Sequence, residues 1–191
     1  MAARLNPQSA IAIVLAWPGG LVRPELVHWF SDNGFPRSSV RYLAHQARDA
    51  SQVANYAISV ALRSGKEWAL FSDNDVRPTE NTSIESVYDI TCARCDTGNP
   101  NSYSNANDFH SAFWFARVET LLKIPAPWFR YPEYKPGAFR VSQCYCSAFS
   151  EAAKVARLSI GWHGHAIHKP SPLASGEDSI CKETVEPKGI L

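Results

Sequence analysis

The first 75 residues alternate short apolar runs with amphipathic segments. Apolar positions over 10–17, 39–43 and 67–72 predict strands, and the first run is apolar throughout, as in a strand buried on both faces. Apolar residues at helical spacing predict helices over 22–32 and 50–64. Strand, helix, strand, helix, strand is the order of an α/β fold with a mostly parallel central sheet and flanking helices.

The second half of the chain has similar segments at less regular intervals. A polar stretch over 96–108 and several prolines between 125 and 136 predict irregular structure there. Residues 171–191 are polar and predict a loose tail. The patterned segments are predicted strands at 89–95, 113–117 and 160–168, a short helix ending at Leu122, and a helix over 147–158.

The composition is that of one globular domain without a strong net charge. The chain has 191 residues, 45% of them apolar, and a formal net charge of +1. This apolar fraction excludes wholesale disorder, and the neutral balance excludes a global attraction to nucleic acid or to an anionic membrane. No apolar run approaches about 18 residues, so no membrane span is expected. The five cysteines, an odd number without a secretion signal, predict reduced thiols and a cytoplasmic protein.

An acidic turn follows the third predicted strand directly. Asp73-Asn74-Asp75 stands at the carboxyl end of that strand, the edge of a parallel sheet where ligands bind. Carboxylates at positions i and i+2 of an extended segment point to the same side, and their oxygens suit a hard cation such as Mg²⁺ or Mn²⁺. The alternative is an ordinary turn, since Asp-Asn-Asp is favourable turn chemistry after any strand.

Three of the six histidines lie within the late strand, at His163, His165 and His168. One interpretation is a zinc site built on His163-x-His165. The alternative is that these are ordinary strand-edge histidines. Strict alternation along a strand would place His163 and His165 on one face and His168 on the other.

The cysteines and the aromatic residues each allow two kinds of interpretation. Cys92-x-x-Cys95 and Cys144-x-Cys146 predict either a zinc knuckle, buried free thiols or a disulfide, and the strand-like setting of the first pair favours buried thiols. Aromatic residues crowd the second half of the chain, where they form either core or a cleft on which a ringed ligand stacks. They are Phe113, Trp114, Phe115, Trp128, Phe129, Tyr131 and Tyr134.

Several stretches together resemble the nucleotide-sugar glycosyltransferases with the GT-A fold. The apolar run at 10–17 resembles their first nucleotide-side strand, and Ala47-Arg48-Asp49 resembles their "Ala-Arg-Asn" helix start, with Asp in place of Asn. Residues 68–78, WALFSDNDVRP, resemble the strand and acidic motif that hold the metal and the sugar nucleotide. Residues 112–117 and Pro127-Trp128-Phe129 resemble a later strand and a "Pro-Trp-Phe" segment.

The resemblance covers about residues 10–170 and implies a small, single GT-A-like domain over 1–170, Rossmann-like in its sheet. Its nucleotide-side half would be about 1–80, its acceptor-side half about 81–170, and 171–191 would be a tail. The implied function is transfer of a sugar from a nucleotide-diphosphate sugar to an acceptor hydroxyl, on a saccharide or, second, a modified nucleic acid. The implied cofactor is Mn²⁺ or Mg²⁺. The resemblance implies that the donor is bound by Trp17, Arg48, Asp73, Asn74 and Asp75. It implies that the metal is bound by Asp73, Asp75 and His168, with His165 as second choice.

One departure from the resembled family concerns the catalytic base. Many inverting members carry an acidic pair shortly before a "Phe-Cys" helix start, and the matching residues 141–146 here, VSQCYC, contain no carboxylate. The base therefore stays unassigned. Two alternatives remain open beside the transferase: a non-catalytic sugar- or nucleotide-binding module on the same fold, and a zinc-dependent protein built on its histidines and cysteines.

Overall fold

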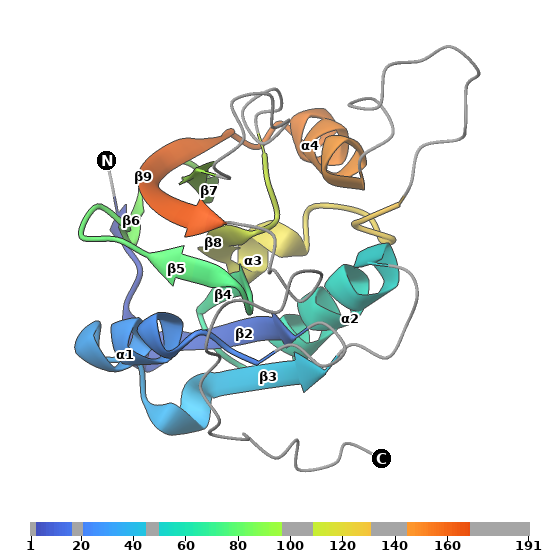
Figure 1. Cartoon of the computed structure of the whole chain (residues 1–191). Coiled ribbons are helices and arrows are strands. Elements are labelled where there is room, and N and C mark those ends of the chain that lie inside the picture. The colour runs from blue at the N-terminus through green and yellow to red at the C-terminus, as the bar shows by residue number, and fades with distance from the viewer. Residues whose placement is uncertain (1–2, 17–20, 45–49, 97–108, 131–144, 169–191) are drawn as a thin grey trace.

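The computed structural model of the chain describes residues 3–16, 21–44, 50–96, 109–130 and 145–168. Strands and helices alternate along its first half (Figure 1). In chain order the elements are β1 (Ala3–Arg4), the 3-10 helix Pro7–Ser9, β2 (Ala10–Ala16), α1 (Pro24–Asp32), the 3-10 helix Arg37–Ser39, β3 (Val40–Ala44), α2 (Ala50–Arg63), β4 (Trp68–Asp73), β5 (Val76–Pro78), β6 (Glu85–Ser86), β7 (Ile90–Asp96), β8 (Phe113–Arg117), α3 (Val118–Leu121), α4 (Tyr145–Val155) and β9 (Ile160–His168).

A seven-stranded sheet forms the centre, in the order β3-β2-β4-β8-β7-β9-β5. Strand β2 runs parallel to β3 and β4, and β7 runs parallel to β9. Strand β8 is antiparallel to both β4 and β7, and β5 is antiparallel to β9. The predicted α/β class is confirmed, as a mixed sheet with a largely parallel core. Because β2, β3 and β4 run the same way, their carboxyl ends lie at one edge of the sheet (Figure 1).

Both faces of the sheet are buried, which explains the continuously apolar first strand. Along β2, Ile11, Ile13 and Leu15 belong to one core cluster, whereas Ala12 and Val14 belong to the other. Helices α2 and α4 pack on the first cluster and α1 packs on the second. Burial on both faces therefore leaves no polar position in the strand interior, and the sequence reads as an unbroken apolar run.

The helices begin and end where local chemistry directs them. Pro24 is the first residue of α1, a position where its missing N–H costs no helical hydrogen bond. Helix α2 ends at Arg63, and Gly65 follows with φ +68, the left-handed conformation that glycine adopts most readily. The predicted boundaries of both helices are within two residues of those observed.

The aromatic residues of β8 form core. Phe113, Trp114 and Phe115 are buried, and the Trp114 ring stacks on Phe71 of the neighbouring strand with centroids 4.2 Å apart. Phe129 is also buried and packs against Trp114 and Phe149. For these residues the core interpretation is confirmed. Tyr131 and Tyr134 lie outside the described residues, as does the tail predicted at 171–191.

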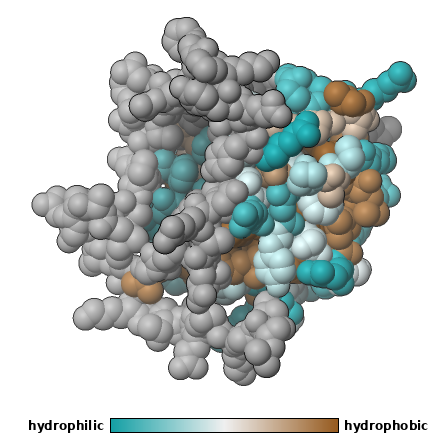
Figure 2. Space-filling model, turned by 90° about the vertical axis from the view of Figure 1, so that its right-hand side faces the viewer, coloured by the Kyte–Doolittle hydropathy of each residue, from teal (hydrophilic) through white to brown (hydrophobic). Residues whose placement is uncertain are grey.

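The described surface is mixed in polarity. The face shown in Figure 2 has hydrophilic and hydrophobic residues interspersed, as globular domains usually do. No helix among the described residues is both long enough and apolar enough to cross a bilayer.

Candidate metal centre

The acidic turn joins β4 to β5 at the carboxyl edge of the parallel strands. Asp73 is the last residue of β4, and its backbone N–H donates to the carbonyl of Ala112, 2.8 Å away, beside the start of β8. Asp75 directly precedes β5. Both carboxylate residues are buried, with 7% and 9% of their surfaces exposed. They are thus held by strand pairing on either side of a two-residue turn, at the edge where the sequence predicts a ligand site.

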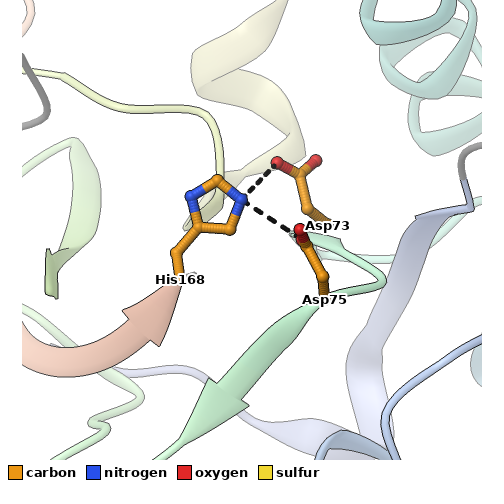
Figure 3. Close-up of side chains that lie close together, drawn as sticks. All are labelled: Asp73, Asp75 and His168. Atoms are coloured by element: carbon orange, nitrogen blue, oxygen red, sulfur yellow. Dashed lines mark ion pairs between the residues drawn. The ribbon is translucent and has the colours of Figure 1, made fainter. Parts of the chain in front are cut away.

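His168 reaches the same place from the far end of the chain. It is the last residue of β9 and lies opposite Val76 in the antiparallel pairing of β9 with β5. Its Nε2 atom is 3.2 Å from Asp75 Oδ1 and 3.6 Å from Asp73 Oδ2 (Figure 3). The expectation that the late strand runs beside the acidic turn is therefore confirmed, and three of the predicted metal-ligating residues lie together.

A β-bulge turns His168 toward the carboxylates. In the pairing of β7 with β9, Cys92 lies opposite Trp162 but Arg94 lies opposite His165, so β9 holds one extra residue. Gly164 stands in this bulge with φ +78, and a Cβ there would lie 2.9 Å from the backbone of Asn81 and Ser83. Such an insertion exchanges the two faces of a strand.

The exchange of faces is visible in the two cores. Trp162 packs against the first core cluster, whereas Ala166, four residues later, belongs to the second. Strict alternation would have kept these two residues, and His168 with them, on one face. The predicted alternation therefore fails between His163 and His165, where the bulge lies, whereas His165 and His168 follow it and lie on opposite faces.

The close approach of two buried carboxylates shapes the ionisation of the site. Burial raises the pKa of Asp73 to about 7; the charge of His168 lowers it and the charge of Asp75 raises it further. Burial lowers the pKa of His168, but its hydrogen bond with Asp75 and the charges of both carboxylates outweigh burial, so the net shift is upward. Both shifts favour the protonated forms, because burial raises the pKa of Asp73 and two carboxylates face His168.

The donor set fits a divalent cation. One ligand atom from each of Asp73, Asp75 and His168 lies within 4.8 Å of the other two. Carboxylate oxygens suit Mg²⁺ and Mn²⁺ alike, and the imidazole nitrogen favours a transition metal over Mg²⁺, whose ligands are almost always oxygens. A cation would also compensate the charge of the two carboxylates in place of bound protons.

His110 is part of this site, and sequence reasoning missed it. Its ring centroid is 5.5 Å from that of His168, and its Nδ1 atom accepts a hydrogen bond from the Ala112 N–H at 3.2 Å. Burial lowers the pKa of His110 to about 4, with a further lowering from His168, while Asp75 opposes both. His110 is therefore neutral beside the cluster. It carries no sequence signal, because it belongs to no motif and precedes a strand that looks like simple core.

Asn74 ties the acidic turn to the segments around it. Its N–H donates to the Leu15 carbonyl at 3.0 Å, its side-chain Nδ2 donates to the Leu21 carbonyl at 3.1 Å, and its own carbonyl accepts from the Arg23 N–H at 3.0 Å. The residue is 3% exposed. These bonds fix the turn against the end of β2 and the start of α1. A direct contact of Asn74 with a donor stays a prediction.

The other predicted site residues lie elsewhere or outside the description. Trp17 and Arg48 fall outside the described residues, so their roles in donor binding stay predictions. His165, the second choice for the metal, is fixed by its backbone, which bonds to Asn81, Thr79 and Thr82. It is not part of the potential metal group found among the described residues. His163 faces Glu85, with 3.4 Å between Nε2 and Oε2.

The cysteines have the properties of buried thiols. Cys92 belongs to one core cluster and Cys95 to the other, so their side chains point to opposite faces of β7. Burial raises the pKa of both thiols, that of Cys95 to about 12, and the nearby Asp73 and Asp75 add to the Cys95 shift. Cys146 is also buried. Cys144 lies outside the described residues.

The mixed sheet, its flanking helices and the acidic turn define a GT-A fold, the class expected from the sequence. The structure is similar to that of A197 from STIV, with a TM-score of 0.51, 15% sequence identity, and 83% of this chain and 82% of that chain covered. It is also similar to a mutant of Drosophila β-1,4-galactosyltransferase 7 in complex with manganese, UDP-Gal and xylobiose. There the TM-score is 0.55, the identity is 12%, and the coverage is 91% of this chain and 77% of that chain.

At such identities the likeness establishes the fold alone. No protein-family model matches the sequence, and no curated protein matches it.

Proposed function

We propose that this chain is a metal-dependent glycosyltransferase that moves a sugar from a nucleotide-diphosphate donor to an acceptor hydroxyl. The observation that carries the proposal is the convergence of Asp73, Asp75 and His168 at the carboxyl edge of the parallel strands. The GT-A fold supports it, since the similar Drosophila enzyme is described with manganese and UDP-Gal. The proposed cofactor is Mn²⁺, with Mg²⁺ second.

In this mechanism Asp73, Asp75 and His168 would hold the cation. When bound, the cation would supply positive charge to the diphosphate of the departing nucleotide. The residues of the chain contribute by placing the carboxylates, by burying them and by adding no unfavourable charge. The turn bonds of Asn74 hold the carboxylates in place, and burial of both carboxylates limits the water that would compete with a cation for their oxygens. His110, neutral beside His168, adds no charge that would repel the cation.

The acceptor proton needs a base that is still unassigned. At the start of α4, where the resembled family places its acidic pair, the first described residue is Tyr145. Its hydroxyl forms a 2.8 Å hydrogen bond with Ser111. Residues 141–146 of the sequence contain no carboxylate. Their composition favours the second candidate, a module that binds a sugar nucleotide without transferring the sugar.

Nucleotide binding and turnover together test the proposal. Thermal shifts are measured for the full chain with UDP, GDP, CDP and dTDP, with and without Mn²⁺, followed by assays of nucleotide release from the matching nucleotide sugars. We expect stabilisation by one diphosphate only in the presence of Mn²⁺, and release of that nucleotide from its sugar donor.

The variant Asp75→Asn should abolish both effects, whereas Asp32→Asn, an exposed carboxylate at the end of α1, should leave them unchanged. Metal-dependent binding without turnover on any donor would support the binding module instead. Nucleotide binding that is equal with and without metal would refute both.

A further inference from the structure

A cavity lies at the end of the sheet opposite the candidate metal centre. Its volume is about 290 Å³, and its lining includes Arg41 from β3, Arg63 from the end of α2 and Lys66 from the turn before β4. Lys66 precedes β4 and Asp73 ends it. The six residues of β4, at about 3.3 Å per residue, separate the two sites by roughly 20 Å. The cavity is therefore independent of the acidic turn.

The lining of this cavity is strongly basic. It contains three cations and no carboxylate. Among the described residues, neither Arg41 nor Arg63 makes an ion pair. The nearest acid along the chain, Glu67, is engaged by Arg117 in an ion pair and by the Ser9 hydroxyl. A chain with a net charge of only +1 thus concentrates three positive charges in one recess.

The position of Lys66 is fixed by the backbone around it. Gly65, with φ +68, turns the chain back, and the Lys66 N–H donates to Ser64 Oγ at 3.1 Å. The ammonium group donates to the Gln8 carbonyl at 3.2 Å. An ammonium group has three protons to donate. One holds Lys66 against Gln8, which leaves donors for a ligand in the cavity.

The remainder of the lining suits a small polar molecule. Ser38 contributes a hydroxyl group, and Ile11 and Val60 contribute aliphatic surface. The volume is just below the range of about 300–1,000 Å³ typical of small-molecule sites. A phosphate group with a small substituent is of the right size.

Each arginine alone has an ordinary structural explanation. Charged side chains on an edge strand such as β3 discourage pairing with other sheets, and a cation at the end of α2 complements the helix dipole. Neither explanation accounts for the convergence of both arginines with Lys66 around one cavity. Three cations repel one another, and a doubly charged anion would relieve that repulsion.

We propose that this cavity binds a phosphomonoester group, either as inorganic phosphate or as part of a phosphorylated sugar. Arginine presents a planar fork of N–H donors that matches phosphate oxygens, and lysine adds a point charge. The charge of about −2 on a phosphomonoester at neutral pH complements the three cations. This site is separate from donor binding and does not depend on the proposed transferase activity.

The test is calorimetric titration of the full chain in EDTA, which silences the candidate metal centre. Inorganic phosphate, glucose 6-phosphate and glucose are titrated separately. We expect saturable binding of the two phosphate compounds at one site and none of glucose. The double variant Arg41→Gln, Arg63→Gln should weaken binding at least tenfold, while Arg157→Gln, an exposed arginine in the turn after α4, should change it less than twofold.

Tighter binding of glucose 6-phosphate than of inorganic phosphate identifies a sugar phosphate as the ligand, and equal binding identifies the phosphate group itself. Three outcomes would overturn the proposal. They are no saturable binding by the wild type, equal weakening by the Arg157 control, and stronger competition by a short single-stranded oligonucleotide than by either small molecule. Circular dichroism of the double variant verifies that it is folded.

Discussion

At the scale of single residues, the candidate site consists of two buried carboxylates that face one imidazole. Asp73 and Asp75 are predictable as candidates from the sequence, because the pair follows a buried strand directly, but the same residues also suit an ordinary turn and only the family resemblance favours the metal. The partner at His168 is predictable only through the family resemblance, since spacing alone does not choose among three histidines. His110 is not predictable at all. Its place beside His168 depends on the pairing of β8 with β4, which no local pattern encodes.

Removing the charge of Asp73 should stabilise the metal-free protein at high pH. The folded-state pKa is about 7, above the ordinary 3.8, so folding favours the protonated form, and stability falls as pH rises from about 4 to 7. Asp73→Asn mimics the protonated form and removes this loss. Each unit of pKa difference corresponds to about 1.4 kcal/mol, so the gain at pH 8 is up to about 4 kcal/mol.

Urea unfolding in EDTA at pH 5 and pH 8 measures this effect. The variant should exceed the wild type in stability by about 2 kcal/mol at pH 5, and the difference should grow to about 4 kcal/mol at pH 8. Asp32→Asn serves as the exposed control and should change stability little at either pH. Equal stability of Asp73→Asn and wild type at pH 8 would contradict the raised pKa of Asp73 that burial causes.

His168→Ala should weaken Mn²⁺ binding at least about tenfold, which corresponds to about 1.4 kcal/mol. The imidazole must be neutral to bind a metal, and the pKa of His168 is raised, so affinity should already decline as pH falls toward the ordinary value of about 6.5. The variant should lose part of this pH dependence. Titration of Mn²⁺ followed by electron paramagnetic resonance at several pH values gives both quantities.

His165→Ala is the matched control for this measurement, because it removes an imidazole from the same strand outside the cluster. The assignment of His168 would be refuted if His165→Ala weakened Mn²⁺ binding and His168→Ala did not.

At the scale of elements, the pattern of apolar positions predicts what each segment is better than how the segments pair. The strands Phe113–Arg117 and Ile160–His168 were predicted with their observed bounds, because each is an apolar or alternating run with clear ends. The insertion of β8 antiparallel between β4 and β7 was not predicted. Pairing depends on contacts between segments far apart in sequence, and the bulge in β9 depends on its fit to the 81–83 turn.

The bulge yields a test at this scale. Gly164→Ala places a Cβ at φ +78 and 2.9 Å from the backbone atoms of Asn81 and Ser83. The left-handed conformation alone costs a non-glycine residue about 1–3 kcal/mol, and the backbone contact adds to it. We expect a lower urea midpoint together with weaker Mn²⁺ binding, because the bulge sets the face on which His168 lies.

Gly34→Ala separates the two contributions. Gly34 has the same φ of +78, but a Cβ there would meet no atom within 4 Å. The Gly34→Ala variant should lower stability through its positive φ alone and leave Mn²⁺ affinity unchanged. If the two variants lowered stability equally and neither changed Mn²⁺ affinity, the bulge would have no role in placing His168.

At the scale of the whole molecule, the parallel strands separate two kinds of charge. Carboxylates gather at their carboxyl ends and cations at their amino ends. The near-zero net charge of the sequence hides this separation, because the fold determines where each charge lies. The candidate metal centre joins residues 73–75 to residue 168, so a bound cation would tie the middle of the chain to its last described strand. Metal binding should therefore affect the stability of the whole domain.

We accordingly expect Mn²⁺ to offset the fall in stability that occurs as pH rises. Without metal, ionisation of Asp73 and deprotonation of His168 both remove stability as pH rises through their raised pKa values. With Mn²⁺, the same ionisations create the ligands, so the stabilisation grows over the same interval. At a metal concentration 100 times Kd the stabilisation amounts to about 2.7 kcal/mol, or roughly 5–10 °C in Tm for a chain of this size.

Thermal unfolding between pH 5 and pH 8, with Mn²⁺ or with EDTA, measures the pH dependence of stability with and without metal. The two curves should nearly coincide at pH 5 and separate progressively above pH 6.5, and in Asp75→Asn the gap should close at every pH. A constant gap across this range would mean that Mn²⁺ binds at a site that does not titrate with these residues, and the assignment of the cluster would be wrong.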